Sequence, residues 1–158
     1  MALGSLEVIQ VTRYAFETTG SAQRRIARQQ PVPMRTVTPG TIKVHAMLTC
    51  GMCNEPVLTT LTSITVDTTD HRLIFGVTLQ NVSGAQQIDY FAEVSLQDPF
   101  GHTYEGTGNL NSDFFLDAGQ TAMKTEIFSF LPRPGVSYTL LARLGITGIA
   151  YDPLQVTF

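Results

Sequence analysis

Tryptophan is absent from the 158-residue chain, and cysteine occurs only twice. Two cysteines cannot supply the several cross-links that hold small secreted domains together. The sequence has no run of about 18 apolar residues, so it predicts no membrane-spanning helix. Residues 1–16 also lack the basic stretch and the long apolar stretch of a secretory signal. We therefore expect no membrane partner, and a location inside a cell or a virion.

Motifs of the common enzyme classes are missing as well. There is no G-x-S-x-G, no H-E-x-x-H, no P-loop and no glycine-rich dinucleotide turn. Asp67 and Asp70 lie beside His71, a combination suited to acid/base chemistry. However, Asp and Thr in a tight turn more often bond to the backbone. The sequence thus predicts a protein that is not an enzyme.

Charge is scarce and unevenly distributed. Charged residues make up 15% of the chain, below the usual share of about a quarter. Residues 1–35 hold five arginines and two glutamates, whereas the remainder holds five cations and eleven acids. Arg24, Arg25 and Arg28 could contact phosphates, but nucleic-acid binding normally needs a basic cluster that dominates the domain charge. We favour a solvated connector that supplies solubility or docks on an acidic neighbour.

Apolar and polar residues alternate over much of the chain, which is the pattern of strands with one buried face. The odd-numbered residues of 73–79 (Leu, Phe, Val, Leu) form one apolar row. The even-numbered residues of 88–96 (Ile, Tyr, Ala, Val, Leu) form a second row. Between them, residues 81–87 supply turn residues for a return of the chain. Residues 71–98 therefore predict two antiparallel strands, paired with each other, with one wet face.

Similar runs recur from residue 57 onward, separated by turn signals about every eight to twelve residues, as in β-sandwiches. Further strands are expected at 58–66, 102–108, 121–131, 137–144 and 154–158, with a loop at 108–119. Earlier in the chain, residues 6–16 and 41–48 predict two more strands, joined by a basic connector at 17–35. The sequence thus predicts an all-β sandwich over 57–158. Residues 1–56 would form a stranded extension, packed on the sandwich or exchanged with another copy.

The stretch from Leu131 to Tyr138 resembles the E-to-F corner of fibronectin type III and related immunoglobulin-like domains. In those families a Leu and a Pro lead to a Tyr whose hydroxyl bonds back to the backbone, and Leu131, Pro132 and Tyr138 match that pattern. A D-x-x-G-x-x-Y stretch that starts at Asp98 is also similar to a corner of small bacterial immunoglobulin-like domains. The resemblance implies an antiparallel immunoglobulin/fibronectin-like β-sandwich over 57–158. It implies no particular chemistry, because fold does not carry function.

Cys50 and Cys53 form a C-x-x-C motif, the one group in the sequence suited to metal binding or redox chemistry. Two thiolates at this spacing suit zinc, and His45 and His102 would complete a set of four ligands, within one copy or across a dimer. A local disulfide is an alternative, and a redox pair is another, although it would require a helix N-terminus. Two plain reduced thiols without a cofactor are the favoured interpretation.

Phe114 and Phe115 are apolar residues in a polar stretch. They are candidate partner contacts or, in the favoured interpretation, plugs at the open end of the sandwich. Our leading hypothesis is a non-enzymatic module that acts by protein–protein contact, in a homo-oligomer or a larger assembly. The first alternative is a viral or phage structural subunit, of capsid or tail, with a basic N-terminal arm. The second alternative is a zinc-containing binding domain.

Overall fold

Antiparallel strands make up nearly all the regular structure in the computed structural model, which describes residues 10–13 and 37–158. Within those residues the only helical element is the 3-10 helix η1 (Asn109–Asn111), and no helix has the length and hydrophobicity needed to cross a bilayer. The strands are β1 (Gln10–Arg13), β2 (Gly40–Leu48), β3 (Val57–Asp67), β4 (Arg72–Asn81), β5 (Gln87–Asp89), β6 (Phe91–Gln97), β7 (Thr103–Glu105), β8 (Phe114–Leu116), β9 (Thr121–Phe128), β10 (Ser137–Leu144) and β11 (Leu154–Thr157).

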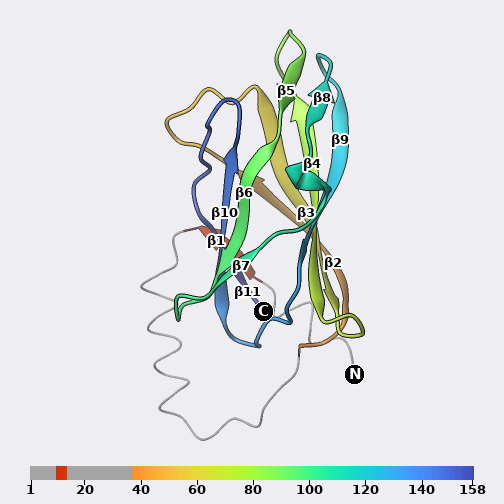
Figure 1. Cartoon of the computed structure of the whole chain (residues 1–158), viewed down its shortest axis with the longest axis vertical. Coiled ribbons are helices and arrows are strands. Elements are labelled where there is room, and N and C mark those ends of the chain that lie inside the picture. Colours follow the sequence, from red (N-terminus) through yellow and green to blue (C-terminus); the bar gives the residue numbers. More distant parts are fainter. Residues whose placement is uncertain (1–9, 14–36) are drawn as a thin grey trace, which may run out of the picture.

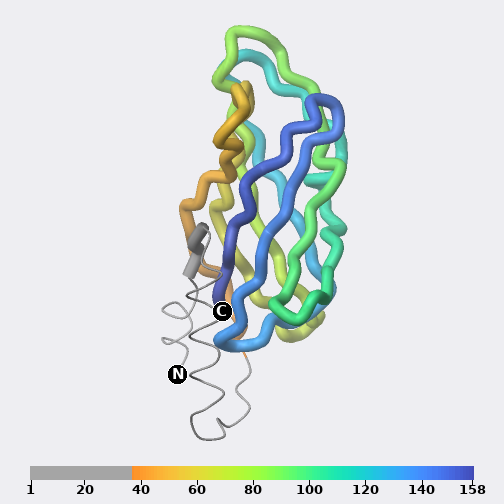
Figure 2. Tube along the Cα trace, turned by 90° about the vertical axis from the view of Figure 1, so that its left-hand side faces the viewer, coloured from red at the N-terminus to blue at the C-terminus, as the bar shows by residue number. Residues whose placement is uncertain are grey.

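The strands form two sheets that face each other, as Figures 1 and 2 show. One sheet has the strand order β1-β11-β10-β6-β7, and the other has the order β2-β3-β4-β9. A separate two-stranded ribbon, made of β5 and β8, lies at one end (Figure 1). Side chains from both sheets meet in one hydrophobic core. The prediction of an all-β, antiparallel fold is confirmed.

β4 shows how sequence alternation becomes a buried face. Its apolar row, residues 73–79 at odd numbers, is buried, whereas the residues between are partly exposed. Burial of each large apolar side chain contributes about 1.5–3 kcal/mol. Phe75 also packs edge-on against Phe128 of β9, with ring centroids 5.2 Å apart. The predicted inward face of this strand is confirmed.

The predicted pairing of the two strands within 71–98 is wrong. β4 pairs with β3 and β9, whereas β6 pairs with β10 and β7 in the other sheet. The turn after Asn81 carries the chain across from one sheet to the other. Both strands do have a buried face, but those faces meet across the core. The alternation of apolar and polar residues specifies which face of a strand is buried, but it does not specify which strands pair with its edges.

The predicted apolar row at 88–96 is correct only in its second half. Val94 and Leu96 are buried, but Ile88 is exposed and Phe91 is buried instead. The strand is broken at Tyr90, and the pairing of β6 with β10 shifts register between Arg143 and Leu144. Such an irregularity adds a residue to one strand and reverses the alternation beyond it. As a result, Ile88 lies on the outside.

The two N-terminal strands pair within the same chain. β2 covers the predicted strand 41–48 and pairs with β3. β1 covers the middle of the predicted strand 6–16 and pairs with β11. The rest of the predicted strand, and the basic connector 17–35 with its three clustered arginines, lie outside the described residues. The predicted loop at 108–119 is wrong in part, since η1 and β8 form within it.

Two turns hold the end of the molecule that lies opposite the β5–β8 ribbon. Asp98 accepts hydrogen bonds from the N–H groups of Phe100 and His102, both at 2.9 Å. In the second turn, the Arg133 N–H donates to the Tyr138 hydroxyl at 2.9 Å. Tyr138 is buried, and this burial raises the pKa of its hydroxyl. The bond joins residues only five positions apart, so it fixes the turn that leads into β10.

Candidate interaction surface at the loop end

Four segments, residues 49–56, 81–90, 112–120 and 145–153, form one end of the molecule (Figure 1), which we call the loop end. Backbone bonds connect each of them to at least one of the others. The second segment bonds to the first through Val82 N–H and the Pro56 carbonyl, and pairs with the third as β5 and β8. The first and fourth segments also bond to each other, from Asp152 N–H to the Thr49 carbonyl at 2.7 Å. Each segment is thus positioned by its neighbours.

Asn81 attaches the β5–β8 ribbon to the body of the molecule. Its side chain is fully buried, and its amide donates to the carbonyls of Ala85 at 2.8 Å and Leu116 at 2.9 Å. Its carbonyl oxygen accepts from both the N–H and the hydroxyl of Ser83. A buried amide with all these bonds made fixes the chain on both sides of the ribbon.

Asp89 fixes the fourth segment against the second. Its buried carboxylate accepts bonds from Ile146 N–H at 2.8 Å, from Thr147 N–H at 3.2 Å and from the Thr147 hydroxyl at 2.8 Å. Burial alone would raise the pKa of Asp89, but these bonds and one from Tyr90 N–H lower it below its ordinary value. The charged form of the Asp89 carboxylate therefore stabilises the folded loop.

The Asp89→Asn variant should be less stable than the wild type at pH 7, by about 1–3 kcal/mol, because charge-assisted bonds to the loop are lost. A lowered pKa means that this contribution is present above the ordinary value of 3.8 and disappears as the pH falls through the folded-state value. Urea unfolding at pH 7 and at pH 3 measures both effects. Asp117→Asn, at an exposed position, is the control. Equal stabilities of the Asp89 variant and the wild type at pH 7 would contradict this role.

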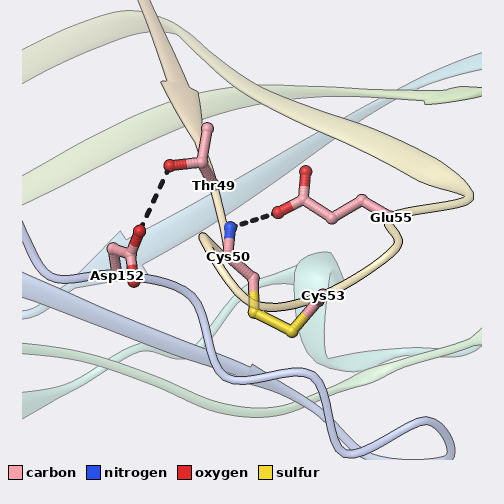
Figure 3. Close-up of a disulfide and its surroundings, with 5 residues drawn as sticks. All are labelled: Thr49, Cys50, Cys53, Glu55 and Asp152. Carbon is pink, nitrogen blue, oxygen red and sulfur yellow. Dashed lines mark hydrogen bonds between the residues drawn. A yellow bond between two sulfur atoms is a disulfide. The ribbon is translucent and has the colours of Figure 1, made fainter.

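A disulfide between Cys50 and Cys53 closes the turn in the first segment (Figure 3). The two Cα atoms are 5.3 Å apart, within the span that a disulfide allows. The Cys50 N–H donates to the Glu55 carboxylate, and the Thr49 hydroxyl donates to Asp152 at 3.4 Å (Figure 3). This turn holds Met52, whose side chain is 99% exposed.

Large apolar side chains are exposed mainly at the loop end. Of the seven such residues among those described, Phe100 lies in the β6–β7 turn and Met123 on β9. The other five are on the loop end: Met52, Val82, Ile88, Phe115 and Ile146. Ile88 and Phe115 are direct cross-strand partners, so their side chains lie on the same face of the ribbon.

The loop end is also acidic in composition. Its four segments contain no Lys or Arg, whereas they contain Glu55, Asp89, Asp113, Asp117 and Asp152. Asp89 is buried and engaged, so the exposed charge comes from the others. The arrangement can make apolar contact and can repel a strongly acidic partner.

The predicted zinc ligands are not brought together. Cys50 and Cys53 are joined to each other, so they have no thiolates to offer a metal. His102 bonds to Asp98 at 2.9 Å in the turn at the opposite end, and His45 is exposed on β2. No group of three or more potential ligand residues occurs in the part of the chain that the structure describes. The local disulfide, one of the alternatives that the sequence left open, is the state observed.

The other predicted site residues have mixed positions. Phe114 is buried against Phe91, with ring centroids 6.4 Å apart, whereas Phe115 is 60% exposed. One of the pair thus belongs to the core and only the other is available for contact. Leu131 is half-buried and Pro132 is buried, beside the bond made by Tyr138. The predicted contacts Arg24, Arg25 and Arg28 lie outside the described residues.

The exposure of Ile88, Ile146 and Met52 was not predicted from the sequence. Nor was the role of Asn81 and Asp89 in positioning the segments on either side of the ribbon and at residues 145–153. Alternation placed Ile88 on a buried face, and its reversal at the strand break gives no sequence signal. Asn81 had one usable signal, since an Asn at the start of an N-x-S-G turn commonly bonds to the nearby backbone.

No family model matches this chain, and no curated protein matches it.

Proposed function

We propose that this protein is a non-enzymatic β-sandwich module that acts by protein–protein contact, with the loop end as its contact surface. The observation that carries the proposal is the gathering of five of the seven exposed large apolar side chains on that end. Exposed apolar groups that cluster in this way mark sites of interaction. The segments that present them are fixed by hydrogen bonds and by a disulfide, so little conformational entropy is lost when they bind.

An immunoglobulin-type order of strands supports the proposal. With β3 taken as strand A, β3, β4 and β9 are neighbours as strands A, B and E are in immunoglobulin domains. In the other sheet, β11, β10 and β6 are neighbours as strands G, F and C are. The loops that correspond to the B–C and F–G loops then belong to the loop end. In variable-type immunoglobulin domains those loops carry recognition.

The carboxylates with lowered pKa values also support a role without catalysis. Burial opposes the lowering at Asp89 and Asp98, but backbone N–H groups lower the pKa of both. At Asp67, the bond from Asp70 N–H lowers the pKa most, followed by the bond from Arg72. These carboxylates therefore hold turns in place, which accounts for the Asp67–Asp70–His71 group without acid/base chemistry.

A photo-crosslinking side chain introduced in place of Phe115 tests the proposal in an extract of the cells that produce the protein. We expect covalent protein adducts from this position, and from Ile88 and Ile146 replaced in the same way. Phe100 is a matched control, because it is 65% exposed and lies in the turn at the opposite end. Adduct yields that are equal at Phe115 and Phe100 would overturn the proposal.

A further inference from the structure

Glu126 of β9 is a carboxyl group that is fully buried without a counter-charge. Its Oε1 accepts a bond from Ile127 N–H at 3.3 Å, and its Oε2 has no hydrogen-bond partner among the described residues. None of the ion pairs found in the described part of the chain includes it. An ionised carboxylate in such a place loses more by desolvation than its hydrogen bonds to backbone N–H groups restore.

Residues 106–113, which we call the strap, seal this carboxyl group from water. A Cβ atom on Gly106 would lie 2.6 Å from the Glu126 carboxyl carbon, and one on Gly108 would lie 2.6 Å from its Oε1. The strap therefore passes so close that no side chain fits between. It is held along the edge of β9 by the bond from Thr107 N–H to the Ile127 carbonyl at 2.8 Å. It is also held by the bond from Thr125 N–H to Asn109 Oδ1 at 2.7 Å.

The strap leads directly into the contact surface. Its last residue, Asp113, is followed by β8, which carries the buried Phe114 and the exposed Phe115. Lys124 of β9 reinforces the connection, since its ammonium group donates to the Asn109 carbonyl and to the Ser112 hydroxyl, both at 3.2 Å. A displacement of the strap would therefore move the residues that position Phe115.

We propose that Glu126 is a pH-sensitive latch for the loop end. In its protonated form it allows the strap to close on β9. In its ionised form it favours an open strap that admits water, which loosens β8 and the contact made by Phe115. The latch concerns the regulation of the contact surface, and its biological meaning rests on the proposed function.

The electrostatic surroundings agree with this geometry. Burial raises the pKa of Glu126 from 4.5 to about 7, against weaker opposing effects of the N–H groups of Ile127 and Gly108. Arg72 of β4 is engaged with Asp67, and Lys124 with the strap. The charged residues on the elements around Glu126 are Lys124 on β9, Glu105 and Asp113 beside and in the strap, Arg72 on β4, and Glu93 on β6. Closing takes up one proton, so between the ordinary pKa of 4.5 and the closed-state pKa of about 7 each pH unit should increase the open population about tenfold, and the increase should level off above pH 7.

Amide hydrogen exchange of the full chain between pH 5 and 8.5 tests the latch. Observed rates are divided by the intrinsic rate at each pH, so that only the opening equilibrium remains. We expect the protection of the Thr107 and Thr125 amides in the wild type to fall about tenfold between pH 5.5 and 6.5, and to level off above about pH 7. Protection should stay constant in Glu126→Gln, which cannot ionise, and should fall as in the wild type in the control Glu105→Gln.

A second readout does not depend on any variant. The carboxyl carbon-13 shift of Glu126 in the wild type should titrate near pH 7, where the loss of protection of the strap amides levels off. Constant protection between pH 5.5 and 6.5, or an equal loss in Glu126→Gln, would overturn the latch. The exchange experiment involves no partner, so its failure would leave the contact surface standing. Equal crosslinking at Phe115 and Phe100 would likewise leave the latch standing.

Discussion

Gly108→Ala is expected to lower the free energy of unfolding by about 3 kcal/mol. The added Cβ would overlap the Thr125 carbonyl oxygen and would lie 2.7 Å from the Glu126 Cα. Both atoms belong to the backbone of β9, which cannot move aside as a flexible side chain could. The strap must therefore rise from the strand, which exposes the Glu126 carboxyl group. Urea unfolding at pH 6 measures the loss, and hydrogen exchange shows whether it is confined to the strap and β8.

Gly84→Ala is the matched control for this substitution. A Cβ at Gly84, in the turn before β5, meets no atom within 4 Å. We expect a change of less than about 0.5 kcal/mol, of either sign, because alanine restricts the unfolded chain without a clash in the folded one. Equal stabilities of the Gly108 and Gly84 variants would show that the strap does not lie on β9 as described.

Asn81→Ala should also cost about 3 kcal/mol, and it should disorder the β5–β8 ribbon before the sheets unfold. The substitution removes a donor from the carbonyls of Leu116 and Ala85, the second of which keeps its bond from the Ser83 hydroxyl. It also removes the acceptor of the Ser83 N–H. A buried polar group left unpaired costs about 1–3 kcal/mol. Hydrogen exchange should therefore show loss of protection in β5 and β8, while the central amides of β4 stay protected.

Asn54→Ala provides the comparison, because Asn54 is exposed in the disulfide turn. Its effect should stay below about 0.5 kcal/mol. The prediction for Asn81 fails if its variant unfolds at the same urea concentration as Asn54→Ala. If it holds, the same variant should also give a lower crosslinking yield at Phe115, because the ribbon that presents this residue is no longer fixed.

Patterns that act over short distances could be predicted from the sequence. The alternation in 73–79 identified the buried face of β4, because successive side chains of a strand point to opposite faces. The Asp98 turn followed from residue types that bond to their own backbone a few positions away. The all-β class followed from the repetition of such runs. In each case the residues that determine the structure are neighbours in the chain.

The burial of Glu126, at the proposed latch, could not be predicted from such short-range patterns. Glu126 is fully buried, whereas the apolar Met123 on the same strand is 80% exposed, so hydropathy along β9 does not predict which side chains face inward. The inward position of Glu126 depends on the strap, which covers it from about twenty residues earlier in the chain. Likewise, the sequence left the state of Cys50 and Cys53 open, and the closeness of their backbone positions in the folded turn allows the disulfide.

By itself, the sequence determined that the chain forms antiparallel strands and which side chains of most strands avoid water, since periodicity is a local property. Only the tertiary structure decided that β4 and β6 belong to opposite sheets, that Ile88 and Phe115 are exposed together, and that Glu126 is sealed from solvent. These features depend on which strand edges meet and which loops cover them. Such contacts join residues far apart in the chain, and no local pattern records them.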